Sequence, residues 1–179
     1  MLHKTRGIVL KSVNYGESSV VVQILTEKFG LQSYLINGVK KPKAKVPANL
    51  LQPLHLLDMV VYHKPAGNLQ RVAEVKASPV LQTLPYDVVK SSIAIFLNEV
   101  LYKSVRQQTP DDALFSYVFS SVEWLDGEHR SVANFHLLFL VRLTRYLGFY
   151  PAKAAYRQTF FDLQEGVFTG SKPQHSFFL

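Results

Sequence analysis

The hydrophobic periodicity of this chain changes once, near residue 80, and that change limits the folds open to it. Before this point, apolar and polar residues alternate over short runs that end in turn residues, a pattern typical of β-strands. Beyond it, apolar residues recur every three or four positions, as on one face of a helix. The sequence therefore predicts an α+β protein, with a β-domain over residues 1–80 and an α-helical domain over residues 81–179.

Five strand-like runs fit into the first 80 residues. They cover residues 4–13, 18–26, 31–37, 54–62 and 69–77, and turn sequences separate them. Gly30 ends the reversal between the second and third runs, where glycine can take a positive φ. The strand count and a long connecting loop predict a five-stranded OB-fold barrel, which binds single strands on one face. A small SH3-like barrel is the alternative.

Three helices are expected in the second half. Asp87 is the expected cap of the first, and its expected apolar face consists of Val89, Ile93, Phe96, Leu97, Val100 and Leu101. Thr109 followed by Pro110 predicts the start of the second, which should run to about residue 125. Ser131 is the expected cap of the third, which should end at residue 147 before Gly148. After residue 151 the signals weaken, and Glu165-Gly166 indicates a turn.

The net charge of +7 lies entirely in the first 80 residues. Eleven Lys and Arg residues there face four Asp and Glu residues, whereas residues 81–179 carry nine of each. Solubility needs only a scattered excess of charge, but a one-sided field concentrates a polyanion at one surface. The charge pattern therefore predicts that the barrel meets phosphates.

A basic loop is expected between the third and fourth strands. Residues 38–47 contain four lysines and two prolines, and the prolines exclude a helix interior or a central strand. If each lysine neutralises one phosphate, the logarithm of affinity for a single strand should fall with the logarithm of salt at a slope of about −3. An ordinary solvated loop is the alternative interpretation.

The candidate DNA-binding residues are all cations of the predicted barrel. They are Arg6, Lys11, Lys40, Lys41, Lys43, Lys45, Lys64 and Arg71. Strand alternation places Arg6 and Lys11 on opposite faces of the sheet unless a bulge intervenes, so at most one of them is expected on the binding face. Aromatic residues that could stack on bases are Tyr15, Phe29, Tyr34 and Tyr62, although packing in the core is the alternative for each.

Cations of the helical half are candidates for binding a protein partner. Arg142 and Arg145 are neighbours on one helix face, with Arg130 and His136 expected near the start of the same helix. They could receive an acidic segment of a partner, and a solvated face is the alternative.

Catalysis, metal binding and membrane insertion are not expected. The chain has no cysteine, its histidines lack metal-ligand spacing, and nucleophile-elbow and P-loop patterns are absent, so no cofactor is predicted. The missing cysteines suit a reducing cytoplasm. No apolar run approaches the ~20 residues that cross a bilayer, so we expect a cytoplasmic protein.

Six short segments, in this order and spacing, resemble the bacterial recombination mediator family RecO. They are Lys4-Thr5-Arg6-Gly7-Ile8-Val9-Leu10-Lys11, Tyr15-Gly16-Glu17-Ser18, Leu25-Thr26-Glu27 with Gly30, Gly38-Val39-Lys40-Lys41-Pro42-Lys43, Leu51-Gln52-Pro53-Leu54, and Leu147-Gly148-Phe149-Tyr150-Pro151. The resemblance implies an N-terminal OB-fold and a helical C-terminal domain without catalytic activity. It also implies DNA repair and recombination in the RecF pathway, within the response to DNA damage (the SOS response), and a location at the nucleoid.

The same resemblance implies partners. Members of this family bind single- and double-stranded DNA, anneal complementary strands, engage the acidic tail of single-strand-binding protein, and act with RecR to load RecA. Two features depart from the family. The four-cysteine zinc site of many members has no counterpart here, and Leu137 and Leu138 stand where some members carry paired arginines. Members are usually longer, so the chain is expected to be a truncated form.

The sequence thus predicts a DNA-binding annealing and mediator protein. The alternative is a protein-interaction module whose basic barrel binds an acidic protein segment in place of nucleic acid.

Overall fold

The computed structural model describes residues 1–41, 44–65, 67–106, 108–151 and 158–179. It divides into two compact units, Met1–Ala133 and Asn134–Leu179. The first unit contains a β-barrel and two helices, and the second contains one helix and a small sheet. The predicted domain boundary at residue 80 stays a prediction.

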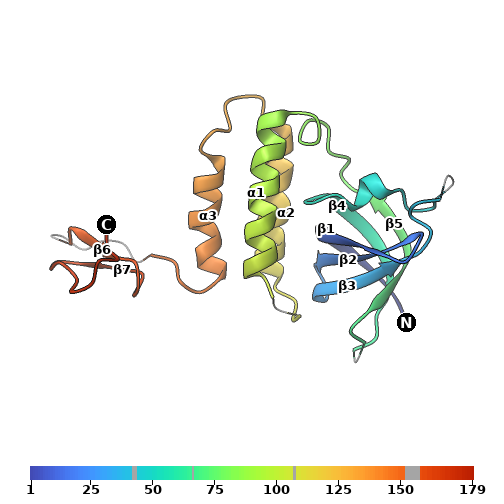
Figure 1. Ribbon diagram of the computed structural model, residues 1–179, viewed down its shortest axis with the longest axis horizontal. Coiled ribbons are helices and arrows are strands. Elements are labelled where there is room, and N and C mark those ends of the chain that lie inside the picture. Colours follow the sequence, from blue (N-terminus) through green and yellow to red (C-terminus); the bar gives the residue numbers. More distant parts are fainter. Residues whose placement is uncertain (42–43, 66, 107, 152–157) are drawn as a thin grey trace. The chain divides into compact units, whose positions relative to one another are not determined.

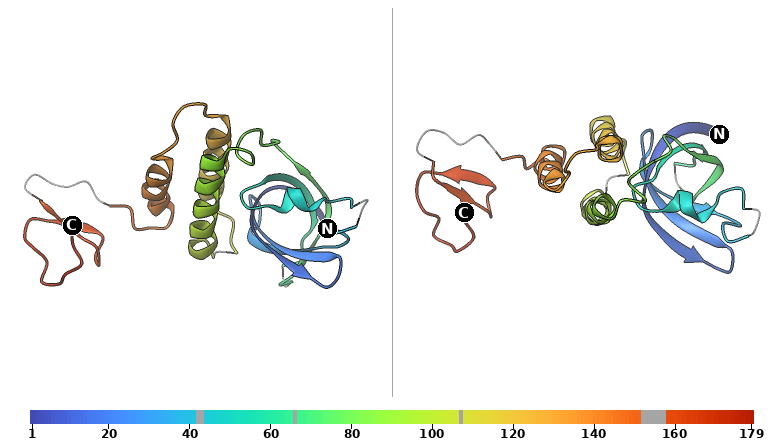
Figure 2. Two further views of the ribbon diagram at one scale, coloured as in Figure 1. Left: turned by 45° about the horizontal axis from the view of Figure 1, so that its top comes forward. Right: turned by 90° about the horizontal axis from the view of Figure 1, so that it is seen from above.

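Five strands form the barrel in the order β1-β2-β3-β5-β4, and β4 closes it by pairing with β1. The strands are β1 (Leu2–Tyr15), β2 (Ser19–Thr26), β3 (Gly30–Ile36), β4 (Leu56–Tyr62) and β5 (Gln70–Ala77). Only the β3–β5 contact is parallel. Figure 2 shows the strands closing into a ring. The predicted OB-fold is confirmed, and the SH3-like alternative is not needed.

The barrel interior is filled by aliphatic side chains and one tyrosine. Its buried core consists of Val9, Val20, Val22, Ile24, Tyr34, Ile36, Val39, Leu51, Leu57, Met59 and Val61. Leu51 belongs to a short 3-10 helix, η1 (Ala48–Leu51), in the β3–β4 loop. Because inward residues alternate with outward ones, the two-residue period read from the sequence directly specifies this core.

A bulge in β1 changes which residues point outward. The pairing of β1 with β2 shifts register between Val9 and Lys11, so Lys11 faces Gln23. The inserted residue, Leu10, is buried, and its carbonyl accepts a hydrogen bond from Asn98 Nδ2 at 2.9 Å. The bulge therefore places Arg6 and Lys11 on the same outer face of the barrel.

Two helices, α1 (Val88–Ser104) and α2 (Asp112–Gly127), lie side by side next to the barrel (Figure 1). Asp87 caps α1 as predicted, because its Oδ1 accepts from the backbone nitrogens of Val89 and Lys90. The expected apolar face of α1 is partly wrong, since Val89 and Phe96 are exposed. The buried face contains Lys90, Ala94, Leu97, Asn98 and Leu101. Two of these residues are polar, and hydrogen bonds make their burial possible.

The predicted start of α2 is wrong by two residues. Asp111, and not Thr109, caps the helix by accepting a hydrogen bond from the backbone nitrogen of Leu114 at 2.9 Å. Pro110 therefore lies before the cap. Thr109 and Asp111 are both suitable cap residues and lie two positions apart, and the carboxylate of Asp111 accepts the hydrogen bond.

A buried carboxylate at the end of α2 holds the segment that joins the barrel to α1. Asp126 accepts hydrogen bonds from the backbone nitrogens of Gln82, Thr83 and Leu84 at 2.7–3.0 Å. Lys90 Nζ donates to the Asp126 carbonyl at 2.8 Å. Burial alone would raise the pKa of Asp126, but the three backbone donors and the nearby Lys90 lower it. The ionised carboxylate therefore fixes the joining segment against both helices.

We expect Asp126→Ala to lower the free energy of unfolding by about 3 kcal/mol, because three backbone N–H groups lose their acceptor and the buried Lys90 loses its countercharge. Glu123→Ala, an exposed change one turn earlier in α2, should alter it by less than about 0.5 kcal/mol. Urea denaturation of both variants checks this. Equal losses in the two would contradict the assigned role.

Gly30 lies close to the backbone of the loop before α2. Its φ of +63° confirms the expected conformation, and a Cβ atom added there would lie 2.5 Å from the Thr109 carbonyl oxygen. Gly16 has the same φ, but a Cβ atom there would meet nothing within 4 Å. The two glycines separate the effect of backbone strain from that of a clash.

Gly30→Ala should therefore destabilise the protein by at least about 1 kcal/mol more than Gly16→Ala does, since the left-handed conformation costs both variants about 1–2 kcal/mol and only Gly30→Ala also clashes with backbone. Thermal or urea unfolding of the pair measures this difference. Identical free energies of unfolding for the two variants would show that the backbone at Thr109 moves to accommodate the added methyl group at no measurable cost.

The second unit begins with α3 (Phe135–Tyr146). Asn134 occupies the cap position, so the expected cap at Ser131 is wrong and Arg130 lies before the helix. The expected end is confirmed, because Leu147 is the C-cap and Gly148 follows with a φ of +85°. The part of the unit beyond Pro151 is described from Gln158 onward.

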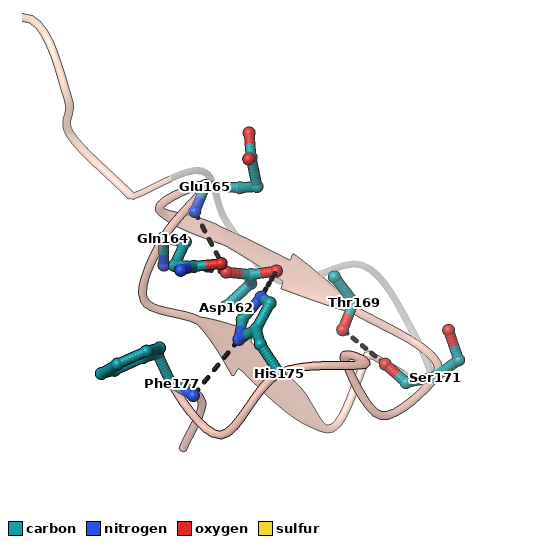
Figure 3. A network of polar contacts seen from close by, with 7 residues as sticks. All are labelled: Asp162, Gln164, Glu165, Thr169, Ser171, His175 and Phe177. Atoms are coloured by element: carbon teal, nitrogen blue, oxygen red, sulfur yellow. Dashed lines mark hydrogen bonds and ion pairs between the residues drawn. The ribbon is translucent and has the colours of Figure 1, made fainter.

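A two-stranded sheet, β6 (Phe160–Asp162) and β7 (Val167–Thr169), completes the second unit and was not predicted as strands. Figure 3 shows the polar contacts around it, with Asp162 accepting from the backbone of Gln164 and Glu165 and contacting His175 Nε2 at 3.1 Å. Because His175 Nδ1 accepts from the Phe177 backbone, the Nε2 atom carries the proton. A carboxylate thus ties the last residues to β6.

Candidate nucleic-acid interface

The β3–β4 loop carries one group of predicted DNA-binding residues. Lys40, Lys41 and Lys45 are exposed, and none forms an ion pair with the residues that the structure describes. The Lys40 backbone nitrogen donates to the Ser18 carbonyl, which holds the start of the loop beside the β1–β2 turn. Lys43 lies outside the described residues. The loop therefore presents uncompensated positive charge.

A second group of cations consists of Lys64 in the β4–β5 loop and Arg71 at the start of β5. Both side chains are exposed and lack a carboxylate partner in the described part of the chain. The buried side chain of Gln70 accepts from the Lys64 nitrogen and donates to the carbonyls of Lys64 and Gly67 at 2.7–2.9 Å. These bonds hold Lys64 and Gly67 next to the start of β5.

Strand β3 connects the two groups. Leu35 pairs with Arg71 in the parallel contact, and β3 ends at Ile36, four residues before Lys40. Tyr34, next to Leu35, pairs with Gln70, the first residue of β5 after the β4–β5 loop that carries Lys64. Cations from the β3–β4 loop and from the start of β5 therefore lie near the same end of β3.

Arg6 and Lys11 are engaged by the helices. The Arg6 guanidinium lies 2.7 Å from Glu27 Oε1 and 4.7 Å from the centre of the Phe119 ring. Its hydrogen bonds lower the pKa of Glu27. Lys11 Nζ donates to the Tyr102 hydroxyl at 3.0 Å. The structure thus separates these two cations from the loop cations, and their predicted contact with DNA stays a prediction.

A groove of about 530 Å³ on the β1–β4–β5 side has mixed charge. Its ionisable lining residues are Lys4, Arg6, Lys28 and Lys76 together with Glu27, Asp58 and Glu74. Lys76 lies 3.6 Å from Asp58, and Arg6 pairs with Glu27. Carboxylates would repel phosphates here, so this groove is less suited to DNA than the two loops are.

The aromatic candidates differ in exposure. Tyr34 is fully buried in the barrel, and its burial raises its pKa, so it cannot stack on a base. Tyr15 and Tyr62 are exposed on the barrel. Phe29 stacks on His63, with ring centres 3.9 Å apart and an angle of 14° between the planes. Sequence patterns could not indicate this pair, because the two residues are 34 positions apart.

The predicted partner-binding arginines are not on one helix. Arg130 belongs to the first unit and lies 3.2 Å from Glu128, whereas Arg142 and Arg145 belong to α3 in the second. The guanidinium of Arg145 lies 4.5 Å from the centre of the Tyr150 ring. Binding of an acidic segment by these residues stays a prediction.

Within the described ranges, no group of three or more His, Asp or Glu residues could hold a metal ion. No helix in the same ranges is both long and apolar enough to span a bilayer.

Comparison with known proteins matches each half of the chain to a protein family. The family described as Recombination protein O N terminal matches residues 1–79, and the family described as Recombination protein O C terminal matches residues 85–171. The chain belongs to the RecO family of DNA repair proteins. The resemblance seen in the sequence is thereby confirmed, together with the barrel and helices that it implied.

Several RecO proteins are similar over the whole chain. DNA repair protein RecO of Phocaeicola vulgatus is 42% identical over 180 residues, which cover 100% of this chain and 75% of that protein. RecO of Bacteroides fragilis is 40% identical over 181 residues, with the same two coverages. RecO of Flavobacterium psychrophilum is 37% identical over 169 residues, which cover 93% of this chain and 70% of that protein.

Arg6→Ala should lower the free energy of unfolding by about 1–2 kcal/mol, because the side chain loses its contacts with two aromatic rings and with Glu27. Lys4→Ala, two residues earlier on the same strand face, is the matched control and should cost less than about 0.5 kcal/mol. Urea denaturation measures both variants. If Arg6→Ala leaves the free energy of unfolding unchanged, the contacts of Arg6 with α2 and Glu27 do not stabilise the fold, and Arg6 remains a candidate for binding DNA.

Proposed function

We propose that this RecO-family chain binds DNA through the barrel and acts as a recombination mediator of the RecF pathway. The observation that carries the proposal is the set of unpaired cations on the β3–β4 loop, on the β4–β5 loop and at the start of β5. Lys40, Lys41, Lys45, Lys64 and Arg71 are exposed there without a carboxylate partner in the described ranges. An OB-fold that binds single strands has this combination of a barrel face and a basic path along it.

Strand annealing would need no catalytic residue. Two complementary strands repel each other through their phosphates, and the loop cations reduce that repulsion by replacing condensed counterions. Bases held loosely on the barrel remain free to pair. The chain would then act as a mediator and not as an enzyme, at the nucleoid of the cytoplasm.

Protein partners are a further part of the proposal. RecR, the acidic tail of single-strand-binding protein, and RecA loading follow from the family and would use surfaces other than the loop cations. The mixed-charge groove on β1–β4–β5 favours a protein ligand over DNA, because its carboxylates can pair with the cations of a partner. The alternative function, binding of an acidic protein segment by the whole barrel, predicts that such a segment displaces DNA from the loops.

Substituting Lys40, Lys41, Lys43 and Lys45 together by Ala should weaken binding of a labelled single strand and reduce the magnitude of its salt slope by about 3, from about 0.7 per lost phosphate contact. Fluorescence polarisation at several salt concentrations measures both quantities. Absence of wild-type binding at low salt would reject DNA binding. An unchanged slope in the variant would place the contacts elsewhere.

A matched pair of double variants controls for net charge. Lys40→Ala with Lys41→Ala removes two unpaired cations, whereas Lys76→Ala with Lys103→Ala removes two cations that are paired with Asp58 and Glu99. The first pair should reduce the magnitude of the salt slope by about 1.4, and the second should leave it nearly unchanged. Equal effects would mean that only total charge matters.

A further inference from the structure

A second groove of the first unit, of about 310 Å³, lies at the end of the barrel away from the basic loop. Its floor includes Gln23 of β2 and Gln32 and Ser33 of β3, and Arg106 and Gln108 of the α1–α2 connection line it from the helical side. The barrel and the α1–α2 connection therefore form this groove together. Local sequence patterns could not indicate it, because its lining residues come from distant parts of the chain.

The lining has the chemistry of a nucleotide site. It combines two cations, Lys28 and Arg106, with amide and hydroxyl side chains, and none of its described lining residues is a carboxylate, in contrast to the mixed-charge groove. Arg106 donates from Nε to the Lys103 carbonyl at 3.3 Å. No ion pair holds its guanidinium in the described ranges. An anion can therefore approach without displacing a carboxylate.

An aromatic pair stands in the same groove. Phe29 and His63 both line it, and they stack on each other while His3 meets Phe29 edge-on at 5.4 Å. Burial, His3 and the N-terminal amine lower the pKa of His63, so its ring is neutral near pH 7. Such a pair offers a base an apolar, planar neighbour.

We propose that this groove is a nucleotide subsite for single-stranded DNA, in which a base packs against the Phe29–His63 pair and the adjoining phosphate meets Arg106. The subsite deepens the proposed function and rests on it. A strand that leaves the β3–β4 loop and follows β3 past Arg71 reaches this groove, because Ser33 and Gln32 lie on the same strand. The helical half thereby contributes directly to DNA binding.

The proposal commits to a single strand. A base within a duplex is paired and stacked, so it cannot present its face to an aromatic pair without being extruded. An acidic peptide could satisfy Arg106, but it would leave the aromatic pair and the amide side chains without a ligand. The subsite therefore distinguishes strands with bases from phosphate chains without them.

The experiment compares a thymidine 12-mer with an abasic 12-mer of equal length by fluorescence polarisation. The wild-type chain should prefer the thymidine strand roughly five-fold or more, the lower end of what one stacked base contributes. Phe29→Leu should reduce this preference, and Arg106→Ala should weaken both ligands while reducing the magnitude of the salt slope by about 0.7. Tyr86→Leu and Lys76→Ala, an exposed aromatic residue and a paired cation outside the groove, are the matched controls.

Photo-cross-linking keeps the test valid if Phe29→Leu folds poorly. A wild-type complex with a 5-iodouracil strand should give a cross-linked peptide that contains Phe29 or His63. Three outcomes would each overturn the subsite. They are cross-links confined to other peptides, equal affinity of the wild-type chain for the thymidine and abasic strands, and displacement of both strands by a glutamate-rich peptide without any preference for the strand that has bases. Wild-type binding of both strands with no effect of the groove variants rejects the subsite alone, whereas failure to bind either strand rejects the proposed function.

Discussion

The bulge in β1 is the constraint on which much of the first unit depends. Strand β1 pairs with β4 over its first half and with β2 over its second, and the register changes between Val9 and Lys11. The inserted Leu10 remains buried, and Asn98 of α1 satisfies its carbonyl. Because an unsatisfied buried carbonyl is costly, the bulge and the docking of α1 stabilise each other.

Because of this bulge, two cations of the barrel, Arg6 and Lys11, differ in their surroundings from the remaining cations. Arg6 and Lys11 turn outward together and meet the aromatic residues of α2 and α1. The loop cations, in contrast, meet no carboxylate in the described ranges. A net charge of +7 is therefore not a uniform field. Part of it holds the helices against the barrel, and the remainder is available to a polyanion.

Docking of the helices also creates surfaces that neither half has alone. The Asp126 carboxylate fixes the segment between barrel and helices, and Gly30 allows the α1–α2 connection to approach the β2–β3 turn. Arg106 thereby comes to line a groove with Phe29 and His63. The proposed nucleotide subsite of this RecO-family chain accordingly draws on the α1–α2 connection as well as on the barrel.

The sequence by itself determined the five strands, the cap at Asp87, the end of α3 before Gly148 and the one-sided charge, because strand alternation, helix-end signals and residue charges can be read from the sequence directly. It failed where two neighbouring residues competed, as Thr109 and Asp111 did for the start of α2, and where a polar residue became buried, as Asn98 did in α1. Only the tertiary structure decided that Tyr34 lies in the core, that Phe29 stacks on His63, and which cations remain unpaired. Those outcomes depend on contacts between residues far apart in the chain. The register shift in β1, which turns Arg6 and Lys11 to the same face, likewise leaves no periodic signal in the sequence.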